Sequence, residues 1–205
     1  MKMDQLIPSL GLMLLAYILG SMPFGLWIAR FWANINIREY GSGNIGVSNV
    51  LRTVGVVPAA IVFVLDAGKG MVPVLLAKNY LSSDEMWLVV GICAVLGHSL
   101  PLFAGFKGGR GVATACGVLL ALSWTVVLVV AAVWIGTLSV SRFISLASIL
   151  AAAALPICFA AFSYPPSYII LGIFLGAFVI WRHRPNIQRL VAGTEYRIGQ
   201  KAEKH

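Results

Sequence analysis

Seven runs of apolar residues constrain this chain more than any other feature of its sequence. A helix that crosses a membrane needs about 20 consecutive apolar residues, and most of the runs approach that length. The sequence contains no strand pattern and no internal repeat. It therefore predicts an all-α, polytopic integral membrane protein with seven transmembrane helices. The runs cover about Leu6–Trp27, Val54–Ala77, Met86–Phe103, Val112–Leu122, Trp124–Val140, Ile144–Phe162 and Tyr168–Trp181.

The ends of these runs indicate how the chain is organised. Only Ser123-Trp124 separates the fourth run from the fifth, so this boundary is the least distinct. The first run is not followed by a small-residue cleavage site, and we expect a retained span rather than a signal peptide. We expect one membrane-embedded domain over residues 1–205, with a polar C-terminal tail at 196–205.

The composition agrees with a membrane protein and excludes several site types. Hydrophobic residues make up 60% of the chain and charged residues 11%, whereas soluble proteins have about 25% charged residues. The excess of 15 Lys+Arg over 7 Asp+Glu would suggest nucleic acid in a soluble protein, but here we expect no nucleic-acid partner. The three cysteines lie inside apolar runs without a CxxC motif, so we expect no metal and no disulfide.

The cations are distributed asymmetrically between the connections. If the N-terminus lies outside, the connections after the first, third and fifth spans and the C-terminal tail all lie in the cytoplasm. The outside then holds only the cations Lys2 and Lys78, with Asp4, Asp84 and Glu85. This distribution follows the positive-inside rule and predicts a cytoplasmic site. The inside cations are Arg30, Arg38, Arg52, Lys107, Arg110, Arg142, Arg182, Arg184, Arg189, Arg197, Lys201 and Lys204.

The stretch GFKGGRGVAT, residues 105–114, combines four glycines with Lys107 and Arg110. Glycine lets backbone N–H groups approach a ligand closely, and the apolar run from Val112 can begin a helix whose positive end faces the loop. A phosphate would suit such a loop. A flexible basic turn between two membrane helices is the alternative.

A second glycine-rich stretch, GSGNIGVSNVLR, spans residues 41–52 and ends in Arg52. Its glycines alternate with hydroxyl and amide side chains, which can donate hydrogen bonds to oxyanions. It is not a Walker A loop, because no Gly-Lys-Ser/Thr closes it. An ordinary Gly/Asn turn is the alternative, but a second phosphate-like loop on the same predicted face favours a functional role.

Two further polar segments lie on this predicted face. Ser141, Ser145 and Ser148 have the spacing of one helix face, and Arg142 can anchor a helix end in the headgroup layer. His183 lies among arginines, where it could accept a proton or donate a hydrogen bond to phosphate. A basic patch that contacts anionic lipid is the alternative for this last segment.

Three polar side chains fall within or at the end of apolar runs. Asp66 and Lys69 lie at i, i+3 in the second run, and we expect a structural ion pair, with a proton relay as the alternative. His98 ends the third run, where we expect a structural hydrogen bond rather than direct catalysis.

Four motifs in this order resemble the bacterial acyl-phosphate:glycerol-3-phosphate acyltransferase family, the PlsY type. They are GSGNIGVSNVLR, GHSLPLFAGFKGGRGVAT, SRFISLAS and WRHRPNIQRLVAGTE, and the likeness extends over nearly the whole chain. The family consists of seven-helix enzymes of the bacterial inner membrane with a cytoplasmic active site. The resemblance implies transfer of an acyl chain from acyl phosphate, not acyl-CoA or acyl carrier protein, to the sn-1 hydroxyl of glycerol 3-phosphate. The products would be lysophosphatidic acid and phosphate, in the first acylation step of phospholipid biosynthesis.

The resemblance also implies a set of site residues. Glycerol 3-phosphate would contact Arg52, Arg110, His183 and Asn186, which are also the expected catalytic residues, with support from Lys107, Arg142, Ser145 and Ser148. Glu195 would orient the cationic tail. We expect no metal and no cofactor, and a functional link to the enzyme that makes acyl phosphate. The residues expected to bind acyl phosphate are Ser42, Gly43, Asn44, Gly46, Gly108 and Gly109.

Two departures from the family pattern leave this chemistry intact. Gly46-Val47-Ser48-Asn49 replaces GATN, and Ser48 keeps the hydroxyl of threonine. Arg110 replaces the second lysine of KGGKG and keeps the charge with a forked set of donors. The general base stays open between His183 and a phosphate oxygen of the donor.

Other function classes fit the sequence less well. The H-x4-D motif of other glycerolipid acyltransferases begins at neither His98 nor His183, and the three aspartates are too dispersed for a CDP-alcohol phosphotransferase. A transporter for phosphate or phosphorylated metabolites would share basic loops and broken helices, and it stands as the alternative.

Overall fold

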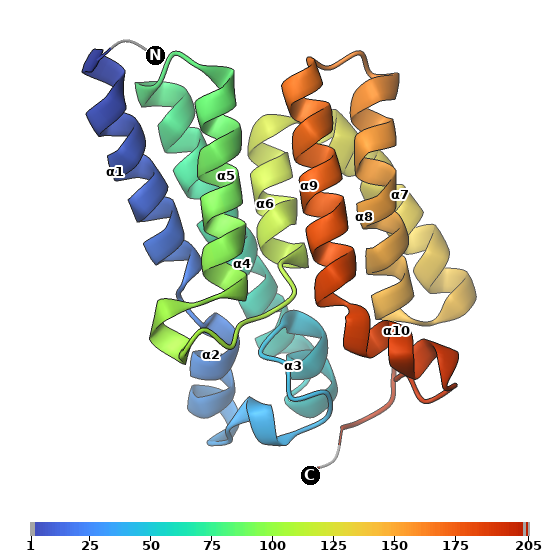
Figure 1. Ribbon diagram of the computed structural model, residues 1–205. Helices are drawn as coiled ribbons and strands as arrows, with labels where there is room; N and C mark the ends of the chain where they lie inside the picture. Colours follow the sequence, from blue (N-terminus) through green and yellow to red (C-terminus); the bar gives the residue numbers. More distant parts are fainter. Residues whose placement is uncertain (1–2, 203, 205) are drawn as a thin grey trace. The chain divides into compact units, whose positions relative to one another are not determined.

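The computed structural model describes residues 3–202 and 204 of the chain, with side chains described from residue 5 (Figure 1). Lys2 and the side chain of Asp4, which the charge analysis places outside, lie outside the described part. The regular elements of residues 3–202 and 204 are all helical, as predicted. They are α1 (Met3–Gly20), α2 (Phe24–Ala33), η1 (Ile37–Glu39), α3 (Val47–Thr53), α4 (Val56–Tyr80), α5 (Asp84–Ser99), η2 (Leu102–Ala104), α6 (Val112–Leu122), α7 (Trp124–Ser141), α8 (Ile144–Ala161), α9 (Pro166–Arg182) and α10 (Arg184–Val191).

Each predicted apolar run is largely helical, but residues 21–23 interrupt the first run and residues 100–101 interrupt the third. The runs also differ in whether they can cross a membrane. Five segments of the described chain are long and apolar enough, and they include α1 and α2 taken together as Gln5–Ala33. A sixth is possible if α9 and α10, which meet at a bend of 57°, form one span. The helix α6 has 11 residues, about 16 Å at 1.5 Å per residue, and is shorter than the apolar core of a bilayer. The protein is a helical membrane protein.

The chain divides into two compact units, Met1–Leu122 with Lys201–His205, and Ser123–Gln200. The break falls at the boundary that was least distinct in the sequence. Ser123 ends the helical run because its hydroxyl accepts a hydrogen bond from Val126 N at 3.2 Å and so caps α7. The predicted separation of the fourth and fifth runs is therefore confirmed.

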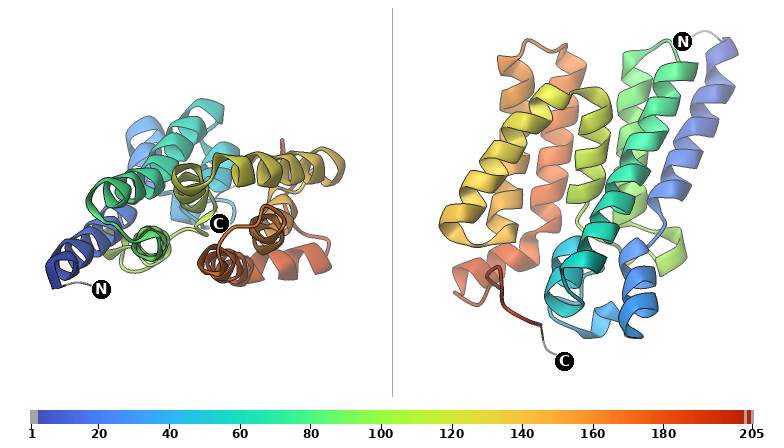
Figure 2. Two further views of the ribbon diagram at one scale, coloured as in Figure 1. Left: turned by 90° about the horizontal axis from the view of Figure 1, so that it is seen from above. Right: turned by 180° about the vertical axis from the view of Figure 1, so that it is seen from behind.

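In the first unit, α4 packs against α1, α5 and α6 (Figure 2). The approach of α4 to α6 depends on glycine. A Cβ on Gly70 would collide with the carbonyl oxygen of Thr114, and a Cβ on Gly117 would collide with that of Ala67. Small residues at such contacts let membrane helices pack closely where no hydrophobic effect drives them together.

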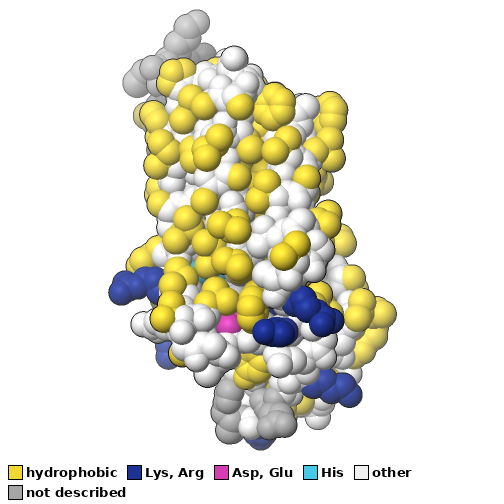
Figure 3. Space-filling model, turned by 90° about the vertical axis from the view of Figure 1, so that its right-hand side faces the viewer, with side chains coloured by type: hydrophobic (Ala, Val, Ile, Leu, Met, Phe, Trp, Pro, Cys, Tyr) yellow, Lys and Arg dark blue, Asp and Glu magenta, His cyan; other side chains and the backbone are white. Residues whose placement is uncertain are grey.

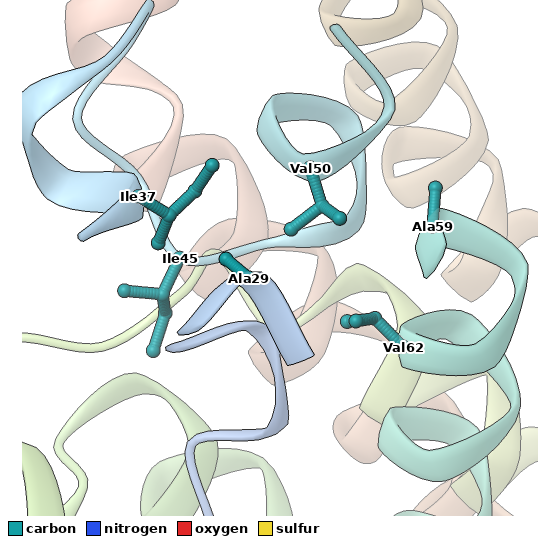
Figure 4. Packing of buried hydrophobic residues seen from close by; sticks show 6 residues of the cluster. All are labelled: Ala29, Ile37, Ile45, Val50, Ala59 and Val62. Atoms are coloured by element: carbon teal, nitrogen blue, oxygen red, sulfur yellow. The ribbon is translucent and has the colours of Figure 1, made fainter. Parts of the chain in front are cut away.

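One end of the first unit is held by a compact apolar cluster (Figure 4). Ile37 precedes the first glycine-rich stretch, Ile45 lies within it, and Val50 comes from α3. They pack with Ala29 of α2 and with Ala59 and Val62 near the start of α4. The cluster fixes both ends of the first loop to the helices that flank it.

In the second unit, α8 packs against both α7 and α9. The polypeptide turns from α9 into α10 at His183, which is the C-cap of one helix and the N-cap of the other. Large hydrophobic side chains are exposed on the outer faces of these helices, as expected for surfaces in contact with lipid: Trp124, Leu128, Ile135, Ile157 and Ile170. On the face seen in Figure 3, hydrophobic side chains cover much of the surface and Lys and Arg side chains gather towards one end.

Candidate active site

The glycine loop of residues 105–111 leads directly into α6, which begins at Val112 as predicted. Gly105 and Gly111 have φ values of +62° and +86°, a backbone conformation that favours glycine. Lys107 is exposed, and Arg110 is half-buried. The loop therefore brings two cations to the positive end of a helix, the arrangement expected for binding an anion.

Arg38 connects the two glycine-rich segments, a role that no pattern in the sequence indicates. Its Nη2 donates to the carbonyl oxygens of Ala104 at 2.8 Å and Lys107 at 2.7 Å. Arg38 lies in η1, just before the first loop, so one side chain joins both loops in the first unit. The sequence identified Arg38 only as one of many cytoplasmic cations, because no local pattern reveals which distant carbonyl a side chain reaches.

Asn49 organises the first loop from within. Its buried amide donates to the carbonyl oxygens of Ile37 at 3.1 Å and Tyr40 at 3.0 Å. Its Oδ1 accepts a hydrogen bond from Ser42 N at 3.0 Å. This side chain therefore sets the path of the backbone, although the sequence suggested no role for it.

Two of the residues expected to bind acyl phosphate hydrogen-bond to one another. Gly46 N donates to the Oδ1 of Asn44 at 2.8 Å. The backbone N–H of Gly46, expected to face the substrate, is thus satisfied inside the loop. The side chain of Asn44 can donate a hydrogen bond to a substrate only through its Nδ2 amide, because its Oδ1 is an acceptor.

Arg52 lies in the last turn of α3 and is buried, with 7% of its surface exposed. Its carbonyl oxygen accepts a hydrogen bond from Ala202 N at 3.2 Å. Lys204 forms an isolated antiparallel β-bridge with Tyr40, and its Nζ forms an ion pair with Glu39 Oε2 at 3.5 Å. The predicted polar tail therefore returns to the first unit beside Arg52.

In the second unit, Glu195 is the centre of a buried polar cluster. Its Oε1 accepts hydrogen bonds from Ser145 Oγ at 2.8 Å and Asn186 Nδ2 at 2.7 Å. Its Oε2 accepts one from Arg189 Nε at 2.7 Å. Burial opposes ionisation of this carboxyl, but the hydrogen bonds from Asn186, Ser145 and Arg189 outweigh it and hold the pKa of Glu195 below its ordinary value. The cluster therefore joins α8 to α10 through a carboxylate.

His183 is buried at the junction of α9 and α10, with 2% of its surface exposed. Its Nδ1 lies 2.7 Å from the carbonyl oxygen of Val179. Because a carbonyl oxygen can only accept, Nδ1 carries the hydrogen, and in the neutral ring the lone pair is on Nε2. This tautomer suits a side chain that accepts a proton through Nε2.

The structure corrects the expected serine face. Ser141 ends α7, while α8 begins at Ile144, and Arg142 separates them with φ +63°. Ser141 therefore does not share a helix face with Ser145 and Ser148. Ser148 donates to the carbonyl oxygen of Ile144 at 2.9 Å and accepts from Trp134 at 3.2 Å, so its hydroxyl is engaged within the unit.

The structure brings the expected residues together in two groups. In the first unit, Arg38 joins the two glycine-rich segments. The first segment carries Ser42, Gly43, Asn44, Gly46 and Arg52, and the second carries Lys107, Gly108, Gly109 and Arg110. In the second unit, Glu195 joins Ser145 and Asn186. Among residues 3–202 and 204, no three His, Cys, Asp or Glu side chains are grouped closely enough to bind a metal ion.

Comparisons with known proteins identify the family of this chain. The family model described as glycerol-3-phosphate acyltransferase matches residues 10–193. A glycerol-3-phosphate acyltransferase of Desulforamulus reducens is 48% identical over 91% of this chain and 93% of its own length. One of a Jannaschia species is also 48% identical, over 91% of each chain.

Solved structures are similar over almost the whole chain. The crystal structure of PlsY, an integral membrane glycerol 3-phosphate acyltransferase, in its glycerol 3-phosphate form has a TM-score of 0.89 and 42% identity. The match covers 94% of this chain and 96% of that one. The lysophosphatidic acid form has a TM-score of 0.87 and 41% identity, with the same coverage. Because relatives are up to 48% identical over about nine-tenths of the chain and the family model matches residues 10–193, this chain belongs to the glycerol-3-phosphate acyltransferase family.

Proposed function

We propose that the protein transfers an acyl group from acyl phosphate to the sn-1 hydroxyl of glycerol 3-phosphate, which yields lysophosphatidic acid and phosphate. The observation that carries the proposal is the pair of glycine-rich loops that Arg38 joins, because a reaction between two phosphorylated substrates needs two anion sites. The related PlsY structures in glycerol 3-phosphate and lysophosphatidic acid forms support the acceptor and the product. A transporter would not require these paired loops.

The proposed roles follow the chemistry of each group. Ser42, Gly43, Asn44, Gly108 and Gly109 serve the acyl phosphate through backbone and side-chain donors. Gly46 contributes to that site through Asn44, with which it forms a hydrogen bond. The residues that serve glycerol 3-phosphate are Arg52, Lys107, Arg110, Arg142, Ser145, Ser148, His183 and Asn186.

The proposed reaction is a direct acyl transfer. The sn-1 oxygen attacks the carbonyl carbon, the new ester bond forms, and the bond from that carbon to the phosphate oxygen breaks. Nε2 of His183 takes the hydroxyl proton, and phosphate leaves with the electron pair. A mixed anhydride has a good leaving group, so the enzyme contributes chiefly by positioning the hydroxyl and by neutralising charge with Arg52 and Arg110.

We also propose the finer topology that the charges predict. The chain has seven membrane spans in the bacterial inner membrane, with its N-terminus outside and with its C-terminus and active site in the cytoplasm. The separate helices α7, α8 and α9 support this count, and α6, although shorter than the apolar core, would supply the fourth span. The enzyme that makes acyl phosphate is then a functional partner on the same side.

The donor can be identified with purified protein in detergent or lipid mesophase. Radiolabelled glycerol 3-phosphate is supplied with palmitoyl phosphate, palmitoyl-CoA or no donor, and EDTA is added throughout. We expect labelled lysophosphatidic acid only with palmitoyl phosphate. Product with palmitoyl-CoA alone would contradict the proposed donor. No product with either donor, from folded protein, would favour a transporter, which uptake into liposomes would then test.

The role of His183 can be tested by replacing it with glutamine. If Nε2 accepts the proton, kcat should fall by about 100-fold or more, the usual contribution of a general base, while the KM for glycerol 3-phosphate changes much less. Arg184→Gln is the matched control, because Arg184 is the exposed neighbour of His183 on α10. A kcat within about fivefold of the wild type would assign proton transfer to the phosphate of the donor instead.

A further inference from the structure

Beneath the glycine loop lies a group of buried polar side chains to which the proposed mechanism gives no role. Asp66 and Lys69 of α4 form an ion pair with 2.6 Å between Lys69 Nζ and Asp66 Oδ1. His98, near the end of α5, places Nδ1 at 3.6 Å from the same carboxylate oxygen. All three side chains are almost fully buried, with at most 4% of their surface exposed. Buried charges are costly, so their retention calls for an explanation.

His98 contacts the glycine loop through both its backbone and its ring. Its carbonyl oxygen accepts a hydrogen bond from Gly109 N at 3.2 Å. A Cβ on Gly109 would collide with Nε2 of the His98 ring, and a Cβ on Gly108 would collide with the His98 carbonyl oxygen. The centre of the glycine loop therefore lies directly on this histidine.

The ring spans the distance between the carboxylate and the loop. Nδ1 lies 3.6 Å from Oδ1 of Asp66, and Nε2 is the ring atom nearest to the position that a Cβ of Gly109 would occupy. The Asp66 carboxylate thus faces one side of the imidazole, and the opposite side lies against the loop. An ion pair that served only to neutralise buried charge would be complete with Asp66 and Lys69.

Lys69 connects the same carboxylate to the start of α2. Its Nζ donates to the carbonyl oxygen of Met22 at 2.8 Å and lies 5.4 Å from the centroid of the Phe24 ring. The loop is also held by Arg38 through the carbonyl oxygens of Ala104 and Lys107. His98 of the buried group therefore contacts the loop at Gly108 and Gly109. Arg38 contacts the segment at different residues, Ala104 and Lys107.

We propose that His98 and Asp66 are positioning residues of the glycine loop: Asp66 orients the His98 ring, and His98 sets the backbone path through Gly108 and Gly109 that binds phosphate. This inference rests on the proposed function of the loop as a substrate site. Neither residue contacts the reacting atoms. Their effect on the reaction is to keep the loop's N–H groups, Lys107 and Arg110 in the arrangement that binds an anion.

Limited proteolysis can measure how firmly the loop backbone is held, without any activity assay. Trypsin cleaves after Lys107 and Arg110, and cleavage after exposed Arg197 in the second unit is the internal standard. In purified protein in detergent, we expect His98→Ala and Asp66→Asn to increase cleavage at the loop about tenfold relative to Arg197. Lys78→Met is the matched control, because Lys78 is a cation of α4 that donates to Ala121 O at 2.9 Å and lies over Trp87. Unchanged loop cleavage, or equal acceleration at every site, would overturn the proposal.

Steady-state kinetics then separate this inference from the proposed function. We expect both variants to raise the KM for at least one phosphorylated substrate about fivefold or more, with a smaller change in kcat, and Lys78→Met to match the wild type. Faster cleavage of the loop with unchanged KM values would keep the positioning role and reject the loop as a substrate site. Cleavage at the wild-type rate, with unchanged KM values, in His98→Ala and Asp66→Asn would reject the positioning role and leave the proposed substrate site in place.

Discussion

Glu195→Ala is expected to lower acyl transfer by about 100-fold or more, the loss that a displacement of about 1 Å in a substrate-positioning element can cause. Glu195 accepts three hydrogen bonds, from Ser145 of α8 and from Asn186 and Arg189 of α10. Alanine would leave two buried donors without their acceptor, at a cost of about 1–3 kcal/mol for each. The contact between α8 and α10 would then loosen, and with it the position of Asn186. Initial rates with saturating substrates and the melting temperature in detergent measure both effects.

Two further variants test whether the loss is specific to Glu195 and whether it comes from the lost acceptor or from the lost charge. Glu85→Ala removes an exposed carboxylate from the first turn of α5 and should leave both activity and melting temperature close to the wild type. Glu195→Gln keeps an oxygen acceptor for Ser145 and Asn186 but loses the charge that faces Arg189, so it should retain more activity than the alanine variant. Full activity of Glu195→Ala in folded protein would show that the cluster does not position Asn186.

The pH dependence of stability gives an independent check on Glu195. Because the pKa of this carboxyl is lowered in the folded protein, its stabilising effect is complete above the ordinary glutamate pKa of about 4.3. The effect is lost as pH falls through the folded pKa, when the carboxylate is protonated. The melting temperature of the wild type should therefore fall more steeply below about pH 4.3 than that of Glu195→Gln.

The helical architecture was predictable because it depends on properties that a sequence carries locally. A run of apolar residues in a membrane must satisfy its own backbone hydrogen bonds, and a helix does so. Ser123 could be identified as a break because a serine cap acts within three residues of itself. For the same reason, the start of α6 after the glycine loop followed from composition alone.

The contacts that hold the two loops were not predictable, because they join residues that are far apart in the sequence. Arg38 lies 66 and 69 residues from the carbonyls that it contacts, and no spacing rule connects them. The serine face was wrong at Ser141 because Arg142 adopts a left-handed conformation, which is uncommon for a residue other than glycine. The ion pair of Asp66 and Lys69 was predictable from its i, i+3 spacing, but its contact with His98 was not.

Gly70→Ala is expected to melt about 2–12 °C below Gly68→Ala, which itself should leave the melting temperature unchanged or raise it slightly. Both substitutions are in α4, and both gain about 0.5–1 kcal/mol of helix propensity, so the comparison isolates packing. A Cβ at Gly70 would collide with the carbonyl oxygen of Thr114, while a Cβ at Gly68 meets nothing within 4 Å. Backbone cannot move aside as a side chain can, and overpacking costs about 1–3 kcal/mol, or about 2–4 °C per kcal/mol for a protein of this size.

The same contact lies just after the glycine loop, so Gly70→Ala is also expected to affect catalysis. Gly70 follows Lys69, and Thr114 lies in the first turn of α6, directly after the loop. If α6 is forced away from α4, the loop moves relative to Asp66 and His98, and the KM for a phosphorylated substrate should rise in Gly70→Ala but not in Gly68→Ala. Equal melting temperatures for the two variants would mean that α4 and α6 separate without cost. A lower melting temperature with unchanged KM values would mean that the loop is positioned from His98 and Arg38 alone, independently of the helix that follows it.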